Sequence, residues 1–407
     1  MSEPDPPGRD KRGRTARAPG VAYARGAPRV LRGDDPAAIA EAAALVRAGR
    51  LVAFPTETVY GLGANALDAA AVARIFAAKE RPSFDPLIVH LADSAELPDH
   101  VVPADAADPR VERLAARFWP GPLTLVLRRR DHLPGIVTAG LPTVGVRVPD
   151  HAVARALIRA AGVPIAAPSA NRFGRISPTR AEHVARGLGA RVDLVLDGGP
   201  CRVGVESTVV LLAEGQALLL RPGGVPAEAI EAEIGRLDHL ADDEPGTAAL
   251  APGRGGGHYA PGVPLEIAEP GDLAAQPRLR ARPGERLGLL AASAAWAADA
   301  RAAGGPFAAV EVLSPDGDPV AVAARLFDAL HELDLAGLDR IVAQRVRPVG
   351  IGRAVMDRLR RAALAGERPG GSGEPARPGE PARPGEPTRP GEPARPGSPG
   401  EPARDAQ

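Results

Sequence analysis

Short apolar runs alternate with helical patterns along the first part of the chain, and this alternation restricts the possible folds more than any other feature. Helices are expected near residues 69–79, 111–118, 153–161, 180–188 and 227–234. Strands are expected near residues 51–54, 87–91, 123–127, 144–148, 194–196, 208–212 and 218–220. Interleaved elements of this kind predict an α/β domain over residues 30–238. The last two strands follow one another directly, which favours a mixed sheet.

A second, smaller α/β pattern follows a segment rich in Gly, Pro and Asp at residues 239–264, which is expected to be a linker. Strands are expected near 287–290, 308–313 and 341–343, and helices over 319–333 and 351–364. This pattern predicts a small domain at residues 265–365.

Both ends of the chain differ in composition from these two domains. Residues 1–29 are rich in Pro, Gly and Arg and are expected to form a disordered arm. The ordered chain is expected to begin near Asp34, where Asp34-Asp35-Pro36 offers a helix cap and a first-turn proline. Residues 366–407 repeat Gly-Glu-Pro-Ala-Arg-Pro, and such a sequence predicts an extended, solvated tail because it cannot bury a core.

Composition excludes several classes of protein. Cys201 is the only cysteine, so the chain has no internal disulfide and no cysteine-based zinc site, and a reducing cytoplasm is the expected compartment. Lys plus Arg equals Asp plus Glu at 50 each, which argues against a dominant role in binding nucleic acid. No apolar run approaches the ~20 residues that a membrane span needs, and the polar N-terminus does not resemble a secretory signal.

A dense polar cluster follows the first expected strand. Thr56, Glu57, Thr58 and Tyr60 lie between Pro55 and a flexible Gly61-Leu62-Gly63. Loops at the carboxyl ends of strands are where α/β sheets bind ligands. The alternative is that Thr and Glu at this spacing cap the next helix.

Two lone cationic positions have both a structural and a functional interpretation. Lys79 is the only lysine between the two tails, and it lies beside Arg81 at a helix end. The pair could compensate the helix dipole, or it could hold a polyphosphate. Arg147 lies within an apolar strand and needs a partner, either an internal carboxylate or the carboxylate of a substrate. His90 alone is more often structural.

Further polar segments follow other expected strands, at residues 168–177, 204–210 and 220–224. Asn171 in the first of these is one of only two asparagines in the chain. The sequence contains no Gly-x-x-x-x-Gly-Lys-Ser/Thr loop and no dinucleotide fingerprint after a strand. Any nucleotide site would therefore depend on side chains and short strand-end loops.

Taken together, these segments resemble the threonylcarbamoyl-AMP synthases with a YrdC-like domain. In family order the chain carries PTETVYGLG, KERP followed by DPLIVH, FWPGPLT, TVGVRVP, PSANRFGRISPT, VESTVV and LRPGG. His258-Tyr259-Ala260-Pro261 resembles the linker of the longer members, and residues 347–359 resemble the end of their small C-terminal domain. The resemblance covers about residues 34–365. It implies a YrdC-like twisted mixed sheet with flanking helices, plus a small Rossmann-like α/β domain.

The resemblance also implies roles for individual residues. It places ATP against Lys79, Arg81, Asp85, Thr143, Ser169, Asn171, Ser177, Arg221 and Tyr259. It places L-threonine near Thr58, His90, Arg147, Ala167 and Ser207. Lys79 and Arg81 are the expected catalytic pair, Ala167 can contribute only backbone groups, and Tyr259 is expected to fold over the nucleotide. Asp85 departs from the family pattern, where Asn is expected, and a carboxylate there would repel polyphosphate unless it meets Mg²⁺ or a sugar hydroxyl.

The implied reaction converts ATP, L-threonine and bicarbonate into L-threonylcarbamoyl-AMP, diphosphate and water. The carbamate nucleophile is already an anion, so positioning and charge stabilisation suffice and no strong general base is demanded. Mg²⁺ is expected to bridge the phosphates, and no dedicated metal site is expected in the protein. The expected consumer of the product is a transferase that modifies tRNA next to the anticodon.

Two other functions remain open. YrdC-like domains also occur in hydrogenase-maturation carbamoyltransferases, but those chains carry zinc-finger-like modules that one cysteine cannot build. The chain could instead be a tRNA- or double-stranded-RNA-binding module, which a salt-dependent RNA affinity would reveal.

Overall fold

A computed structural model describes residues 28–82, 85–213, 215–239, 258–269, 279 and 281–366. The chain divides into two compact units, residues 1–368 and 369–407. The second unit, with the expected repeat tail, lies outside the described residues, as do most of the expected N-terminal arm and residues 240–257 of the expected linker.

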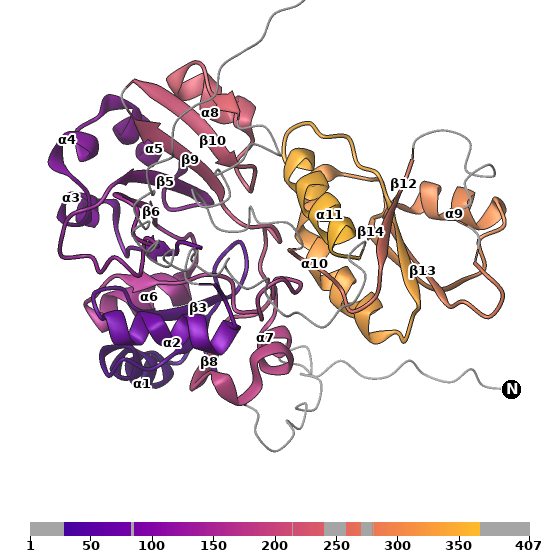
Figure 1. Cartoon of the computed structure of the whole chain (residues 1–407), viewed down its shortest axis with the longest axis horizontal. Coiled ribbons are helices and arrows are strands. Elements are labelled where there is room, and N and C mark those ends of the chain that lie inside the picture. The colour runs from indigo at the N-terminus through magenta and orange to yellow at the C-terminus, as the bar shows by residue number, and fades with distance from the viewer. Residues whose placement is uncertain are drawn as a thin grey trace, which may run out of the picture. The chain divides into compact units, whose positions relative to one another are not determined.

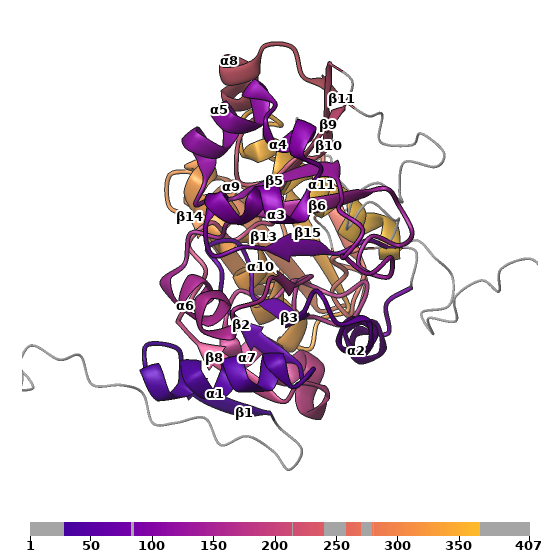
Figure 2. The same ribbon diagram turned by 90° about the vertical axis from the view of Figure 1, so that its left-hand side faces the viewer.

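The larger sheet of the described chain has eleven strands and mixed directions (Figures 1 and 2). Its spatial order is β1 (Arg29–Arg32), β8 (Leu194–Asp197), β2 (Val52–Phe54), β3 (Gly61–Asn65), β7 (Ile165–Ala166), β4 (Ile88–His90), β6 (Thr143–Arg147), β5 (Leu123–Arg128), β9 (Thr208–Ala213), β10 (Gln216–Arg221) and β11 (Asp238–His239). The expectation of a mixed α/β fold is confirmed.

Helices flank this sheet. They are α1 (Pro36–Arg47), α2 (Ala69–Lys79), α3 (Leu97–His100), α4 (Pro103–Ala106), α5 (Pro109–Phe118), α6 (Ala152–Ala161), α7 (Ala181–Leu188) and α8 (Ala227–Ile234). Helix α1 begins as its sequence predicts, because the Asp35 carboxylate accepts a hydrogen bond from Ala37 N and Pro36 occupies the first turn. Its alanine-rich face lets it pack closely against α6.

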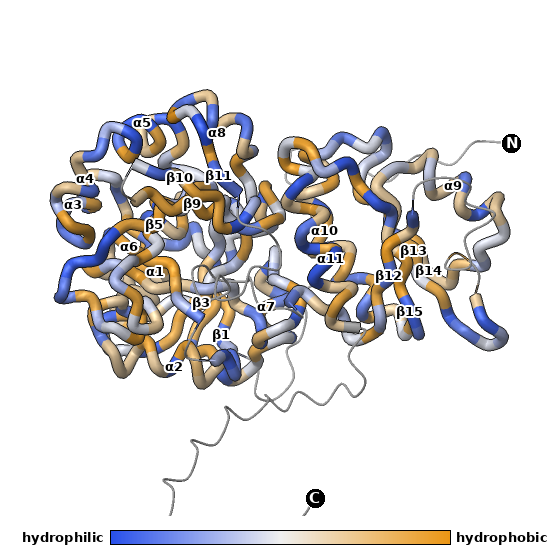
Figure 3. The backbone as a smooth tube through the Cα atoms, turned by 45° about the horizontal axis from the view of Figure 1, so that its top comes forward, coloured by the Kyte–Doolittle hydropathy of each residue, from blue (hydrophilic) through white to orange (hydrophobic). Residues whose placement is uncertain are grey.

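The second sheet of the described chain is parallel, in the order β12 (Leu265–Ala268), β15 (Arg340–Gln344), β13 (Leu287–Ser293) and β14 (Phe307–Ser314). Alternate residues of β13 enter two different cores. Leu290 and Ala292 join a cluster with α10 (Pro319–Leu335) and α11 (Gly352–Gly366), whereas Leu289 and Ala291 join a cluster with α9 (Ala294–Ala302). Helices therefore cover both faces, and Figure 3 shows the hydrophobic runs that mark strands such as β9 and β13.

Two expectations about local structure were wrong. The chain is ordered before Asp34, because Arg29–Arg32 forms β1, which pairs in parallel with β8. Gly61-Leu62-Gly63 is not a flexible turn but the start of β3, antiparallel to β2. The glycines allow close packing: a Cβ on Gly63 would lie 2.6 Å from the Phe54 ring. No helix in the described ranges is long and apolar enough to cross a membrane.

Candidate active site

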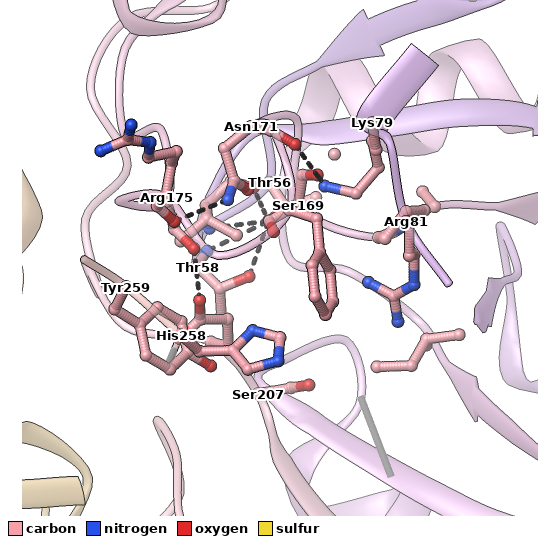
Figure 4. A pocket seen from close by; sticks show the side chains of 18 of the residues that line it. Thr56, Thr58, Lys79, Arg81, Ser169, Asn171, Arg175, Ser207, His258 and Tyr259 are labelled. Carbon is pink, nitrogen blue, oxygen red and sulfur yellow. Dashed lines mark hydrogen bonds between the residues drawn. The ribbon is translucent and has the colours of Figure 1, made fainter. Parts of the chain in front are cut away.

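One cavity collects most of the polar segments that the sequence singled out. It contains about 690 Å³ of empty space, counted out to where it opens to solvent. Its walls come from the β2–β3 loop, the ends of α2, β4 and β6, the loop after β7, the loop before β9, the end of β10, and residues 258–259 (Figure 4). Twelve of the fourteen predicted site residues line it: Thr58, Lys79, Arg81, His90, Arg147, Ala167, Ser169, Asn171, Ser177, Ser207, Arg221 and Tyr259.

The ammonium of Lys79 is fixed by the loop that follows β7. Nζ donates to the carbonyl oxygens of Ser169 and Asn171, each at 2.5 Å, and the residue is only 1 % exposed. An ammonium has three N–H donors, so one remains for a ligand. Burial lowers the pKa of Lys79 well below its usual value, and neighbouring Arg81 lowers it further. An anionic ligand bound here would favour the charged form of Lys79, because a nearby negative charge raises the pKa of an ammonium group.

Arg81 is paired with Asp85, the residue that departs from the family pattern. Asp85 forms an ion pair with it at 2.8 Å, and Arg81 also donates to Pro86 O at 3.0 Å. Asp85 does not line the cavity, so its carboxylate supports Arg81 instead of facing the space where a phosphate would lie. Burial raises the pKa of Asp85, while Arg81 and Lys79 oppose this shift.

Arg147 has the internal carboxylate partner that sequence reasoning left open. Its guanidinium donates to Glu57 and, at 3.1 Å, to Thr58 Oγ1, while Nε has no hydrogen-bond partner among the described residues. Thr56 donates its only hydroxyl proton to Val59 O, so Thr58 must donate to Thr56 Oγ1, 2.7 Å away. Thr58 therefore presents only an acceptor to the cavity.

His90 is a neutral group beside this corner. Burial lowers its pKa to about 3, and Arg147 contributes to the shift. Its Nδ1 lies 3.2 Å from the carbonyl oxygen of Ile88, which can only accept, so Nδ1 carries the proton. Nε2 is then an acceptor.

A third wall is built around Glu206. Its carboxylate accepts from Ser177 Oγ at 2.6 Å and from Arg358 Nε of α11 at 2.9 Å. The next residue, Ser207, accepts from Arg221 at its carbonyl (2.9 Å) and lies 2.8 Å from Thr124 Oγ1. The two strand-end loops before β9 and after β10 thus form one hydrogen-bonded unit.

Residues 258–259 close one side of the cavity (Figure 4). The Tyr259 ring stacks on Phe327 of α10, with centroids 5.5 Å apart, and Arg358 lies 5.3 Å from the ring centroid. His258 contacts Phe173 edge to face. Tyr259 has φ +64°, a strained conformation for a non-glycine residue, which indicates that its surroundings hold it there.

Cationic side chains outnumber carboxylates in the lining. Five cationic side chains line the cavity against one carboxylate, Glu206, which is itself paired with Arg358. The cations are Lys79, Arg81, Arg147, Arg175 and Arg221. Burial lowers the pKa of His258 to about 3, so this histidine is neutral. Such a lining suits a ligand with several negative charges.

Two predicted site residues, Asp85 and Thr143, lie outside the cavity lining, and sequence reasoning overlooked other residues. Thr143 lies at the far end of β6 from Arg147 and borders two other hollows, one with Arg128 and one with Leu141, instead of this cavity. Glu57, Arg175, Glu206, His258 and Arg358 received no role. All five lie inside stretches quoted for the resemblance, but the partner of Arg358 is 152 residues away, and no local signal could have identified that pairing.

Comparison with known proteins now adds to this geometry. A family model described as "Telomere recombination" matches residues 44–223, and one described as "Threonylcarbamoyl-AMP synthase, C-terminal domain" matches residues 225–364. The threonylcarbamoyl-AMP synthase of Bacillus subtilis is 46 % identical over 338 residues, covering 81 % of this chain and 94 % of that protein. That of Halorhodospira halophila is 39 % identical over 166 residues, covering 41 % of this chain and 85 % of that protein.

A solved structure agrees. The crystal structure of a Pyrococcus abyssi relative complexed with L-threonine matches with a TM-score of 0.74 and 41 % identity, covering 84 % of this chain and 98 % of that chain. The sequence motifs, the two sheets and these relatives lead to one conclusion: the chain belongs to the threonylcarbamoyl-AMP synthase family.

Proposed function

We propose that this chain is an L-threonylcarbamoyladenylate synthase, a nucleotidyltransferase that converts ATP, L-threonine and bicarbonate into L-threonylcarbamoyl-AMP, diphosphate and water. One observation carries the proposal. A cluster of buried cations suited to a polyphosphate shares a cavity with a corner suited to a small amino acid.

The corner around Arg147 offers complementary groups for L-threonine. Arg147 keeps an unused Nε–H that can meet a carboxylate, and Thr58 presents an acceptor to an amino group. The acceptor Nε2 of neutral His90 can accept a hydrogen bond from the threonine hydroxyl. The carboxylate and the amino group are common to all amino acids, so the hydroxyl contact is the one that would distinguish threonine from an apolar amino acid of the same shape.

The cations on the other side would hold ATP. The free N–H of Lys79 and the guanidinium of Arg81 face the triphosphate, while Ser169, Asn171, Ser177, Arg221 and Tyr259 surround the rest of the nucleotide. The cavity carboxylate Glu206 is occupied by Ser177 and Arg358, so the residues present fit Mg²⁺ that enters with the ATP phosphates and not a metal held by the protein.

The chemistry then needs little from general bases. The threonine amine and bicarbonate give a carbamate and water. A carbamate oxygen attacks the α-phosphorus, the bond to the β-phosphate breaks, and diphosphate leaves with the negative charge. Lys79 and Arg81 stabilise that charge, and the cavity supplies orientation, which in favourable cases is worth up to ~7–11 kcal/mol. We further propose that a cytoplasmic transferase passes the threonylcarbamoyl group to tRNA.

Product identity tests the proposal directly. The purified protein is incubated with ATP, L-threonine and ¹³C-bicarbonate. The products are separated, and their masses are determined by mass spectrometry. The proposal predicts an adenylate that contains threonine and one ¹³C. If AMP appears without that adduct, or the adduct lacks the label, the proposed reaction is wrong.

A further inference from the structure

Helix α11 places one residue of the second sheet's domain directly behind the cavity wall. The side chain of Arg358 is 0 % exposed, and its Nε donates to Glu206 at 2.9 Å. Its Nη1 donates to Pro222 O at 2.9 Å and to Asp357 at 2.7 Å. Arg358 therefore joins both strand-end loops of that wall to α11.

Helix α10 supports the same wall at a second point. His331 Nε2 donates to the carbonyl oxygen of Ser177 at 3.2 Å. The backbone of α10 also packs against Gly204, two residues before Glu206, so closely that a Cβ on this glycine would lie 2.4 Å from Ala323 O. Two helices thus hold the Ser177–Glu206 pair, and neither contributes a side chain to the cavity lining.

The charge on Glu206 determines which way its hydrogen bond with Ser177 runs. Burial raises the pKa of Glu206, but Arg358, Arg221 and the Ser177 hydroxyl outweigh burial and hold it below its usual value. An ionised carboxylate only accepts hydrogen bonds. The single proton of the Ser177 hydroxyl is therefore used on Glu206, and only the lone pairs of Ser177 remain for a ligand.

We infer that Arg358 is a positioning residue for the nucleotide: by keeping Glu206 as an anion it orients the Ser177 hydroxyl, so that Ser177 accepts a hydrogen bond from a donor group of the nucleotide. A phosphate oxygen is not such a donor. The nucleotide offers the 6-amino group of adenine and the ribose hydroxyls. The inference rests on the proposed binding of ATP in this cavity, and it assigns part of nucleotide recognition to a helix outside the cavity.

The experiment compares ATP affinity, by isothermal titration calorimetry, among the full-length protein and three variants. Arg358→Met removes the charge while keeping an unbranched chain. The double variant Arg358→Met with Glu206→Gln removes both charges, and the glutamine oxygen can still accept from Ser177. Arg340→Met is the matched control, because Arg340 is a buried arginine paired with Glu285 at 2.8 Å in the same domain but outside the cavity.

The expected results separate positioning from stability. Arg358→Met should weaken ATP binding at least tenfold. The double variant should recover an ATP affinity within about threefold of that of the unmodified chain. Arg340→Met should lower the melting temperature, while its ATP affinity stays within about twofold of that of the unmodified chain. If Arg358→Met does not fold, Arg358→Gln, which also removes the charge but can still donate a hydrogen bond, takes its place with the same direction of effect. Unchanged affinity in the Arg358 variant, or a double variant as weak as the single one, overturns the inference.

Three nucleotide analogues identify the donor. In the unmodified chain, 2′-deoxy-ATP, 3′-deoxy-ATP or the triphosphate of purine riboside should bind at least fivefold more weakly than ATP, according to whether the 2′-hydroxyl, the 3′-hydroxyl or the 6-amino group contacts Ser177. If all three bind as ATP does, the inference is wrong. A chain that binds ATP as predicted but forms no adenylate would contradict the proposed reaction and leave this inference standing.

Discussion

Replacing Arg147 by lysine should damage threonine binding far more than ATP binding. The guanidinium donates to Glu57 and Thr58 through separate N–H groups, and its Nε–H, which has no partner among the described residues, is the donor proposed for the threonine carboxylate. A lysine ammonium can neutralise Glu57, but one nitrogen cannot reach all three acceptors. The loss is one hydrogen bond between charged groups, about 1.5–3 kcal/mol, which corresponds to roughly a 10- to 150-fold rise in KM for L-threonine.

Lysine is a better probe here than alanine. Arg147 and Glu57 are both nearly inaccessible, and removing the positive charge would leave a buried, unpaired carboxylate at a cost of about 3–5 kcal/mol. Initial rates of diphosphate release are measured with threonine varied at saturating ATP and bicarbonate, and then with ATP varied at saturating threonine. KM for ATP should change by less than about threefold. Equal changes in both KM values would refute the assignment of Arg147 to the threonine carboxylate.

Three other perturbations have expected outcomes. Lys79→Met should reduce diphosphate release by at least about 100-fold while the circular dichroism spectrum is kept, and substantial turnover would contradict its role at the phosphates. Gly63→Ala should lower the free energy of unfolding by about 1–3 kcal/mol in urea titrations, because its Cβ would overlap the Phe54 ring, and unchanged stability would contradict the close packing of β2 and β3. The free energy of unfolding should also fall between pH 7.5 and pH 5.5, because histidines that stay neutral in the folded chain take up protons in the unfolded chain. The fall should be about 1 kcal/mol for each of His90, His183 and His258, whose pKa values are lowered to about 3 in the folded chain. A flat or opposite trend would be evidence against these pKa shifts.

Elements governed by local signals could be predicted from the sequence. Helices α2 and α8 have the bounds that their sequences indicate, and Asp68 caps α2 through the backbone N–H groups of Ala70 and Ala71. Strand β3 was missed because its Gly-Leu-Gly start looks like a turn, and its identity as a strand depends on pairing with β2 and β7. Short strands whose stability comes from neighbours carry little signal of their own.

The site shows the same division. Four of the five cationic residues that line the cavity, all but Arg175, were found because their motifs are continuous in sequence. The pairing of Arg147 with Glu57 joins residues 90 positions apart, and that of Arg358 with Glu206 joins residues 152 apart. Which carboxylate neutralises which arginine is decided by the fold, so the sequence could show only that Arg147 needed a partner.

Dependence of diphosphate release on each substrate tests the central claim most directly. Diphosphate is measured with the purified chain and ATP, with L-threonine and bicarbonate added separately and together. The account predicts release only when both are present, together with an equal amount of the adenylate. Release that is indifferent to threonine, or absent when all three substrates are supplied, would contradict it.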